Sequence, residues 1–126
     1  GKLFAQFGKG KPPPGVPGLE TMLPLLLTAV AEGRLTLERL LELTYENPRR
    51  IFALPTQPDT WIEVDPDARY TIADQNLHTK CGWTPFAGLV AQGRVRRVVL
   101  RGQTAFLEGR ITVQPGFGQP VRPVKR

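Results

Sequence analysis

The chain contains no serine, and its 126 residues include one cysteine and one histidine. The absence of serine excludes a serine–histidine–aspartate hydrolase, because the nucleophile of that triad is a serine hydroxyl. The single cysteine, Cys81, excludes an internal disulfide and is typical of a reducing compartment. The single histidine, His78, stands in a polar stretch, where a solvated side chain is more common than a metal ligand. These residues therefore give the chain no catalytic constellation of its own.

Long hydrophobic runs are also scarce. The longest apolar stretch covers residues 23–31, which is far too short to span a membrane. The first eleven residues have no apolar core of the kind found in a signal peptide. We therefore expect no membrane association and a cytoplasmic location. The length suits one domain at most and is short for a complete (β/α)8 barrel, which needs about 250 residues.

The net charge of +6 raises the question of a nucleic-acid partner. The basic residues cluster in two places: Arg94, Arg96, Arg97 and Arg101, and the tail residues Arg122, Lys125 and Arg126. No aromatic residues alternate with these arginines as they do in single-strand binders. We therefore expect the basic face to meet a neighbouring domain and not a nucleic acid.

A proline-rich stretch at residues 11–21 leads directly into an apolar run. Three successive prolines fix φ and remove backbone donors, so this stretch cannot enter a helix or a central strand. It is either a stiff linker before the first helix or a loop that lines a functional site. The preceding GKGK at 8–11 resembles a phosphate loop but lacks the strand and helix that such a loop needs. Residues 1–10 weakly predict a short strand or a frayed lead-in.

Two helices follow. The first is predicted over 21–32, with Thr21 as N-cap, Pro24 tolerated in the first turn and Gly33 as the stop. Its apolar face comprises Met22, Leu23, Leu26, Leu27 and Val30. Glu20 would stabilise its start through the helix dipole. The connection at 33–35 is short, which makes the two helices near neighbours.

The second helix is predicted to begin at Thr36 and to end at Asn47-Pro48, with one further helical turn at 49–52. Its buried stripe comprises Leu37, Leu40, Leu41 and Tyr45. Helical character stops at Pro55.

Strand patterns alternate with irregular segments in the rest of the chain. Alternation at 59–65 predicts a strand and 69–72 a second strand. Residues 66–67 between them predict a turn, with Asp65 and Asp67 as its caps. Segments 95–100, 104–107 and 110–113 predict an antiparallel meander with turns at Gly102 and at Glu108-Gly109. Helices followed by antiparallel strands indicate an α+β arrangement or parts of two subdomains.

Several long motifs, in order, are similar to one family. They are PPPGVPGLETMLPLLLTAV at 12–30, NPRRIF at 47–52, WTPF at 83–86, VRRVVLRG at 95–102 and PGFGQ at 115–119. Together they resemble the C-terminal part of the dihydroorotase domain found in multifunctional pyrimidine-synthesis proteins. That domain is a member of the amidohydrolase superfamily.

The resemblance implies an α/β fold: the C-terminal portion of an amidohydrolase-type (β/α)8 barrel plus strands of its accompanying small β-sandwich. Residues 1–54 would supply the last barrel loop and helices, residues 55–119 the sandwich strands, and residues 120–126 a basic tail or the start of a linker.

The implied activity is the reversible cyclisation of N-carbamoyl-L-aspartate to dihydroorotate by a zinc enzyme. Pro14 and Gly15 would line the substrate pocket with main-chain groups. No metal ligand or catalytic residue of the family matches this chain, so zinc would be bound by parts of the domain outside it. The implied partners are the rest of the barrel, carbamoyl-phosphate synthetase and aspartate transcarbamoylase domains, and a second copy in a homo-oligomer.

The family's catalytic Asp-His-Ala-Pro-His motif would fall near the start of the chain, where residues 1–10 contain neither Asp nor His. Three explanations fit this difference. The chain is a piece of an active enzyme, or it belongs to an inactive dihydroorotase-like scaffold domain, or its first ten residues are foreign to the rest.

Overall fold

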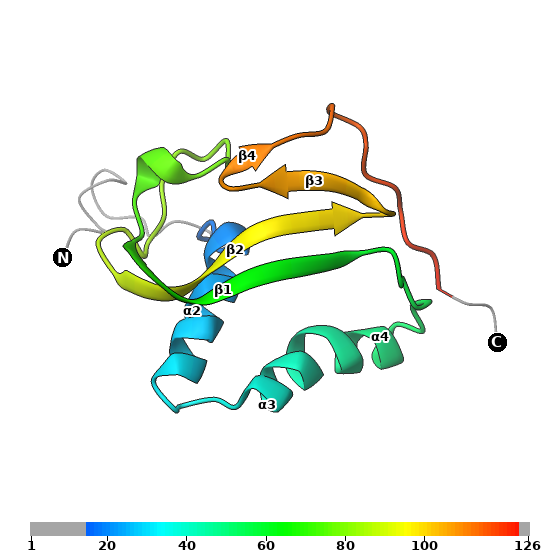
Figure 1. Ribbon diagram of the computed structural model, residues 1–126, viewed down its shortest axis with the longest axis horizontal. Helices are drawn as coiled ribbons and strands as arrows, with labels where there is room; N and C mark the ends of the chain where they lie inside the picture. Colours follow the sequence, from blue (N-terminus) through cyan, green and yellow to red (C-terminus); the bar gives the residue numbers. More distant parts are fainter. Residues whose placement is uncertain (1–14, 124–126) are drawn as a thin grey trace.

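The computed structural model describes residues 15–123, so Pro14, the rest of the triple proline and the lead-in 1–10 lie outside the described residues. Helix α2 (Leu19–Ala31) lies across one face of a four-stranded antiparallel sheet (Figure 1). A second helical run, made of α3 (Leu37–Leu41), the π-helical η1 (Glu42–Glu46) and α4 (Asn47–Ile51), extends beside strand β1 (Figure 1). Apart from one short 3-10 turn, the described helices precede the strands, as the sequence predicted.

Helix α2 begins two residues earlier than expected. The carbonyl of Gly18 accepts the N–H groups of Thr21 and Met22 at 3.2 and 2.9 Å, so Gly18 and not Thr21 is the N-cap. Thr21 is buried inside the first turn, where its hydroxyl donates back to the Gly18 carbonyl. Pro24 therefore falls in the second turn, where its missing N–H cannot serve the carbonyl of Glu20.

Helix α2 ends as the sequence predicted. Gly33 has φ of +70°, and its N–H donates to Val30 O at 3.0 Å while the N–H of Arg34 reaches Ala29 O at 2.9 Å. This pair of bonds is the Schellman arrangement, which needs a residue that tolerates a left-handed backbone. Thr36 then caps α3, because its hydroxyl accepts the N–H of Arg39 at 3.1 Å.

The second helical run does not end at Asn47-Pro48. It passes without a break from α3 through η1 into α4, with Pro48 near the start of α4. A wider π turn lies directly before Pro48, whose nitrogen cannot donate to the preceding turn. The predicted buried stripe is also wrong: Leu40 is buried, whereas Leu37, Leu41 and Tyr45 are about half exposed.

The sheet has the order β1-β2-β3-β4, and every neighbouring pair is antiparallel. The strands are β1 (Trp61–Thr71), β2 (Val90–Leu100), β3 (Gln103–Leu107) and β4 (Arg110–Ile111). Both predicted turns are confirmed, at Arg101-Gly102 and Glu108-Gly109, and all four residues have positive φ. A two-residue hairpin of the I′ type needs positive φ at both central positions.

Strand β1 is one element where the sequence predicted two. Pairing with β2 is interrupted between Asp65 and Arg69 and then resumes, so the expected turn is an irregularity within the strand. Asp65 does cap it, because its Oδ1 accepts the N–H groups of Asp67 and Ala68 at 3.0 and 3.1 Å. Strand β2 begins at Val90 and not at residue 95, because residues 90–92 pair with residues 69–71 of β1.

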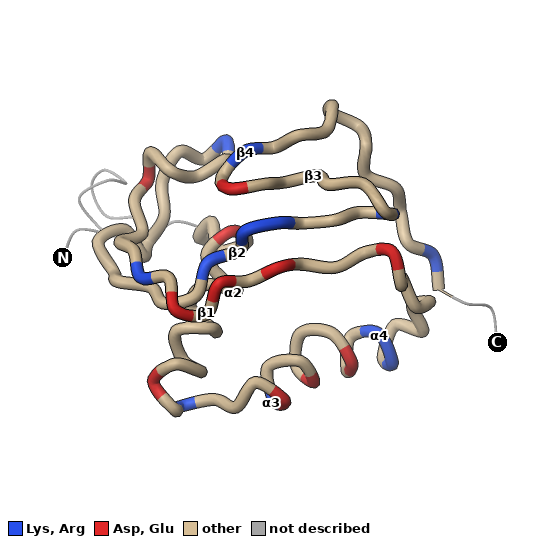
Figure 2. The backbone as a smooth tube through the Cα atoms, viewed as in Figure 1, with Lys and Arg blue, Asp and Glu red and all other residues tan. Residues whose placement is uncertain are grey.

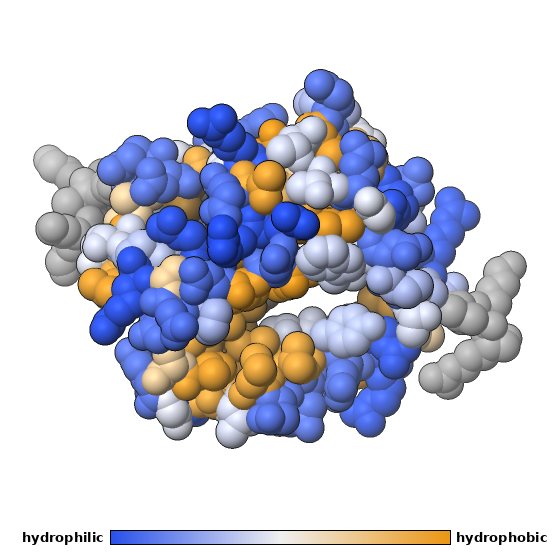
Figure 3. Space-filling model, in the orientation of Figure 1, coloured by the Kyte–Doolittle hydropathy of each residue, from blue (hydrophilic) through white to orange (hydrophobic). Residues whose placement is uncertain are grey.

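The core is small. Its buried apolar residues are Ala29, Leu40, Ile72, Ala91, Val99 and Ala105, and no large side chain among residues 15–123 is fully buried. Apolar side chains on the second helical run stay exposed, among them Ile51 and Phe52. A gap opens between part of this run and the sheet (Figure 3). The described elements thus cover little of their own apolar surface.

Candidate functional site

The loop that leads into α2 is the predicted substrate-binding element, and the structure describes its second half, residues 15–18. Gly15 is exposed, and a Cβ built on it would meet no atom within 4 Å. Among the described residues, no backbone hydrogen bond involves Gly15. Gly15 is therefore exposed and makes no backbone hydrogen bond to another described residue, while Pro14 lies outside the described residues.

Glu20, in the first turn of α2, fixes the end of this loop to a distant segment. Its carboxylate accepts the backbone N–H of His78 at 2.9 Å and that of Thr79 at 2.7 Å, one on each oxygen. A carboxylate that accepts two N–H bonds makes charge-assisted contacts, which are stronger than neutral ones. Sequence reasoning gave Glu20 a dipole role and missed this contact, because nothing local connects residue 20 to residues 78 and 79.

A cavity of about 1000 Å³ opens between the start of α2, the segment 70–78 and residues of all four strands of the sheet. Its apolar lining includes Leu19, Leu23, Ile62, Val98, Phe106 and Ile111. Its charged side chains are Glu20, Arg94 and Glu108, and His78 is one of its polar side chains. The His78 ring meets the Phe106 ring edge-on, with centroids 6.1 Å apart.

Acidic neighbours neutralise part of the basic stripe on β2 (Figure 2). Arg96 pairs with Glu108 at 2.6 Å, and Arg97 lies 3.3 Å from Glu63. The hydrogen bond that Arg96 donates to the Glu108 carboxylate raises the pKa of the Arg96 guanidinium. Two arginines of the stripe are thus paired with carboxylates within the sheet.

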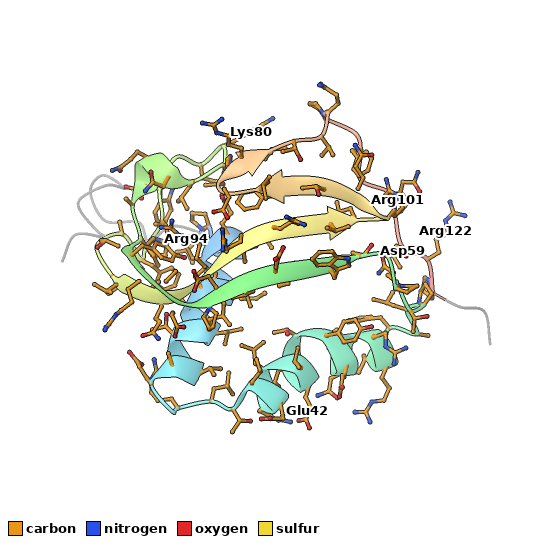
Figure 4. All side chains as sticks on the ribbon, in the orientation of Figure 1. Glu42, Asp59, Lys80, Arg94, Arg101 and Arg122 are labelled. Carbon is orange, nitrogen blue, oxygen red and sulfur yellow. The ribbon has the colours of Figure 1, made fainter. Side chains whose placement is uncertain are left out.

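Arg94, in the first half of β2 and away from Arg101 (Figure 4), stacks on Tyr70 with its guanidinium carbon 4.4 Å from the ring centre. Burial raises the pKa of the Tyr70 phenol above its ordinary value, and the positive charge of Arg94 partly opposes that rise. The neutral phenol is therefore the form that the folded chain favours.

A second cavity, of about 430 Å³, lies where β1 begins and β2 ends. Asp59, Arg101 and Arg122 are found at this end of the sheet (Figure 4). Arg101 donates to the carbonyl of Phe117 at 2.7 Å and covers its ring at 4.6 Å, which holds the segment after β4 against the β2–β3 turn.

Metal-ligating side chains do not gather within residues 15–123, where no three His, Cys, Asp or Glu residues are placed to hold one ion. His78 and Cys81 are both exposed, and Cys81 is a free thiol. The donors of the described segment therefore do not fit a zinc site. Over the same residues, no helix has the length and apolar character needed to cross a bilayer.

Comparison with known proteins identifies relatives of the chain. It is 59% identical over 111 residues to the multifunctional protein CAD of Squalus acanthias, a match that covers 88% of this chain and 5% of that protein. It is 38% identical over 110 residues to a dihydroorotase of Pyrococcus furiosus, covering 80% of this chain and 26% of the enzyme. No family profile matches the chain.

Comparison with solved structures gives relatives of the same kind. The inactive dihydroorotase-like domain of a Chaetomium thermophilum CAD-like multifunctional protein matches with a TM-score of 0.69 and 37% identity, over 89% of this chain and 31% of that one. The chain is a segment of a dihydroorotase-like domain. An L-hydantoinase from Arthrobacter aurescens matches with a TM-score of 0.82 and 32% identity, over 86% of this chain and 26% of the other.

These matches confirm the predicted fold class of this dihydroorotase-like segment, an amidohydrolase-type architecture of which it contributes helices and antiparallel strands. The segment spans 5% of the multifunctional relative and about a quarter of the dihydroorotase. The small core and the exposed helical faces are what a part of a larger domain would show. The proposed boundaries after residues 54 and 119 stay a prediction.

Proposed function

We propose that this segment serves in a dihydroorotase, a cyclic amidohydrolase that interconverts N-carbamoyl-L-aspartate and dihydroorotate in pyrimidine synthesis. The observation that carries the proposal is the 59% identity to the multifunctional protein CAD across 88% of the chain. The matches to archaeal enzymes named dihydroorotase, at 37% and 38% identity, support the same reaction.

In this proposal the segment binds substrate and does not perform the chemistry. Pro14 and Gly15 would offer backbone groups to the dihydroorotate ring. The exposure of Gly15, and the lack of a backbone hydrogen bond from it to another described residue, support that role. The catalytic residues and a zinc centre would come from the rest of the domain, because residues 15–123 bring no set of metal ligands together. Carbamoyl-phosphate synthetase and aspartate transcarbamoylase domains would share the polypeptide, in a cytoplasmic homo-oligomer.

The test uses the complete polypeptide that carries this segment. We expect it to form and to hydrolyse dihydroorotate, to lose both activities on treatment with a chelator and to regain them with zinc. Residues 1–126 alone should show no turnover. A folded, zinc-loaded polypeptide without turnover in either direction would contradict the proposal, and turnover by residues 1–126 would contradict the assignment of the chemistry to other parts.

A second candidate is a non-catalytic dihydroorotase-like domain that supports its neighbours. It is favoured by the structural match to a domain that is described as inactive. The second candidate predicts a complete polypeptide with no stoichiometric zinc and no turnover. Metal analysis of the purified protein, read beside the activity assay, separates the two candidates.

A further inference from the structure

Glu20, on α2, accepts hydrogen bonds from a loop that is distant in the sequence. Its partners, the backbone N–H groups of His78 and Thr79, are 58 and 59 residues away. Each carboxylate oxygen takes one backbone N–H, so the contact fixes both the direction and the distance of the side chain. A helix-dipole role would need the negative charge alone and no such partners.

The contact joins two elements that the chain order keeps apart. On one side, Glu20 lies two residues after Gly18, whose carbonyl starts α2, and five residues after Gly15. The backbone of the first turn therefore transmits the position of the Glu20 side chain to the end of the loop.

The other side of the contact is braced on the core. His78 and Thr79 follow the short 3-10 helix η2 (Asp74–Asn76), and Asp74 Oδ1 accepts the N–H of the buried Thr84 at 2.7 Å. The segment that holds Glu20 is thus itself anchored, so the carboxylate ties the loop to a fixed point and not to a free strand of chain.

We infer that Glu20 is a positioning residue that sets the place of the loop 15–18 by holding the start of α2 to the backbone of residues 78 and 79. The inference rests on the proposed function in one respect: the loop presents Gly15 to dihydroorotate. Glu20 touches no reacting atom in this scheme and acts through the backbone of the loop.

Three variants of the complete polypeptide separate positioning from a charge effect. Glu20→Gln keeps one acceptor but turns an NH2 donor toward the second N–H. Glu20→Asp keeps the charge at the helix start, but its carboxylate is one methylene too short for the contact. Glu38→Gln is the matched control. Glu38 stands in the first turn of α3, so this substitution removes the same kind of interaction with a helix dipole.

Hydrogen exchange resolved at single residues gives the first readout. We expect both Glu20 variants to speed the exchange of the His78 and Thr79 amides roughly tenfold, the size of effect of one charge-assisted bond. The Thr21 and Met22 amides, which bond to Gly18, should also exchange faster. Glu38→Gln should change none of these. Unchanged exchange at residues 21 and 22 in Glu20→Asp would overturn the inference in favour of a dipole role.

Kinetics give the second readout. We expect both Glu20 variants to raise the KM for dihydroorotate roughly tenfold with kcat within about twofold of the wild type, because binding geometry and not the reacting groups has changed. An unaltered KM in both variants would also overturn the inference. If the wild-type polypeptide shows no turnover, the proposed function fails, while the exchange measurement still decides whether Glu20 holds the loop.

Discussion

Gly93 on β2 lies directly against Leu27 on α2: a Cβ at position 93 would stand 2.6 Å from the Cβ of Leu27. Gly93 also has φ of +98°, which L-residues with side chains rarely adopt. A close approach and a glycine-specific backbone thus coincide at the point where the helix crosses the sheet. The position of α2, and hence of the loop before it, depends on this contact.

Gly93→Ala should destabilise the complete domain by about 3 kcal/mol or more, since it combines a backbone penalty with overpacking against the helix. Gly102→Ala is the control, because Gly102 also has positive φ, at +76°, but nothing within 4 Å of an added Cβ. Urea unfolding midpoints measure the difference. Equal losses in both variants would show that Leu27 moves aside freely.

Thr28→Val tests the polar contact beside that crossing. The Thr28 hydroxyl accepts the N–H of Gln92 at 2.9 Å and donates to Pro24 O at 2.7 Å. Valine leaves the part-buried N–H of Gln92 without this acceptor, which should lower the free energy of unfolding by about 1–3 kcal/mol. Thr44→Val removes only a bond within its own helical run, to Leu40 O at 2.8 Å, and should cost less in the same unfolding assay.

Alkaline pH should weaken the domain through Tyr70. Burial raises the pKa of its phenol above the ordinary value of 10.0, so the unfolded chain loses the proton first as pH rises. The stabilisation is therefore complete below pH 10 and is lost as pH rises through the higher pKa of the folded state. Unfolding midpoints should fall less steeply above pH ~10 in Tyr70→Phe than in the wild type. The exposed Tyr45, changed to Phe, is the control, and an identical slope in Tyr70→Phe and the wild type would count against the prediction.

Residues 1–126 expressed alone should self-associate or stay partly unfolded. The described helices leave Ile51 69% and Phe52 63% exposed, and apolar surface of this kind favours association. Sedimentation velocity and binding of a hydrophobic dye would measure it. A monomer that melts cooperatively would contradict this prediction.

The local sequence predicted elements whose causes lie within a few residues. Gly33 stops α2 because only its left-handed backbone closes the Schellman bonds, and Thr36 caps α3 with its own hydroxyl. The hairpin turns at Arg101-Gly102 and Glu108-Gly109 could be predicted because the glycine in each tolerates the positive φ that the turn requires. The start of α2 was predicted wrongly: Thr21 belongs to a residue type that often caps helices, yet the N-cap is Gly18, three residues earlier.

The buried stripe of the second helix could not be read from periodicity, because burial depends on a surface to pack against. Leu37, Leu41 and Tyr45 have helical spacing, but the described elements leave about half of each side chain exposed. The continuous strand β1 is a similar case: Pro66 reads as a turn, while pairing with β2 carries the strand past it.

By itself, the sequence determined the order of helices and strands, the stop of α2 at Gly33, the two hairpin turns and the family motifs, because each of these is encoded by residues close together in the chain. The tertiary structure alone decided that Gly93 admits Leu27 and that Glu20 holds the backbone of residues 78 and 79. Both contacts join segments about 60 residues apart, and no local propensity specifies a partner at that distance; only the packing of α2 on the sheet brings them together.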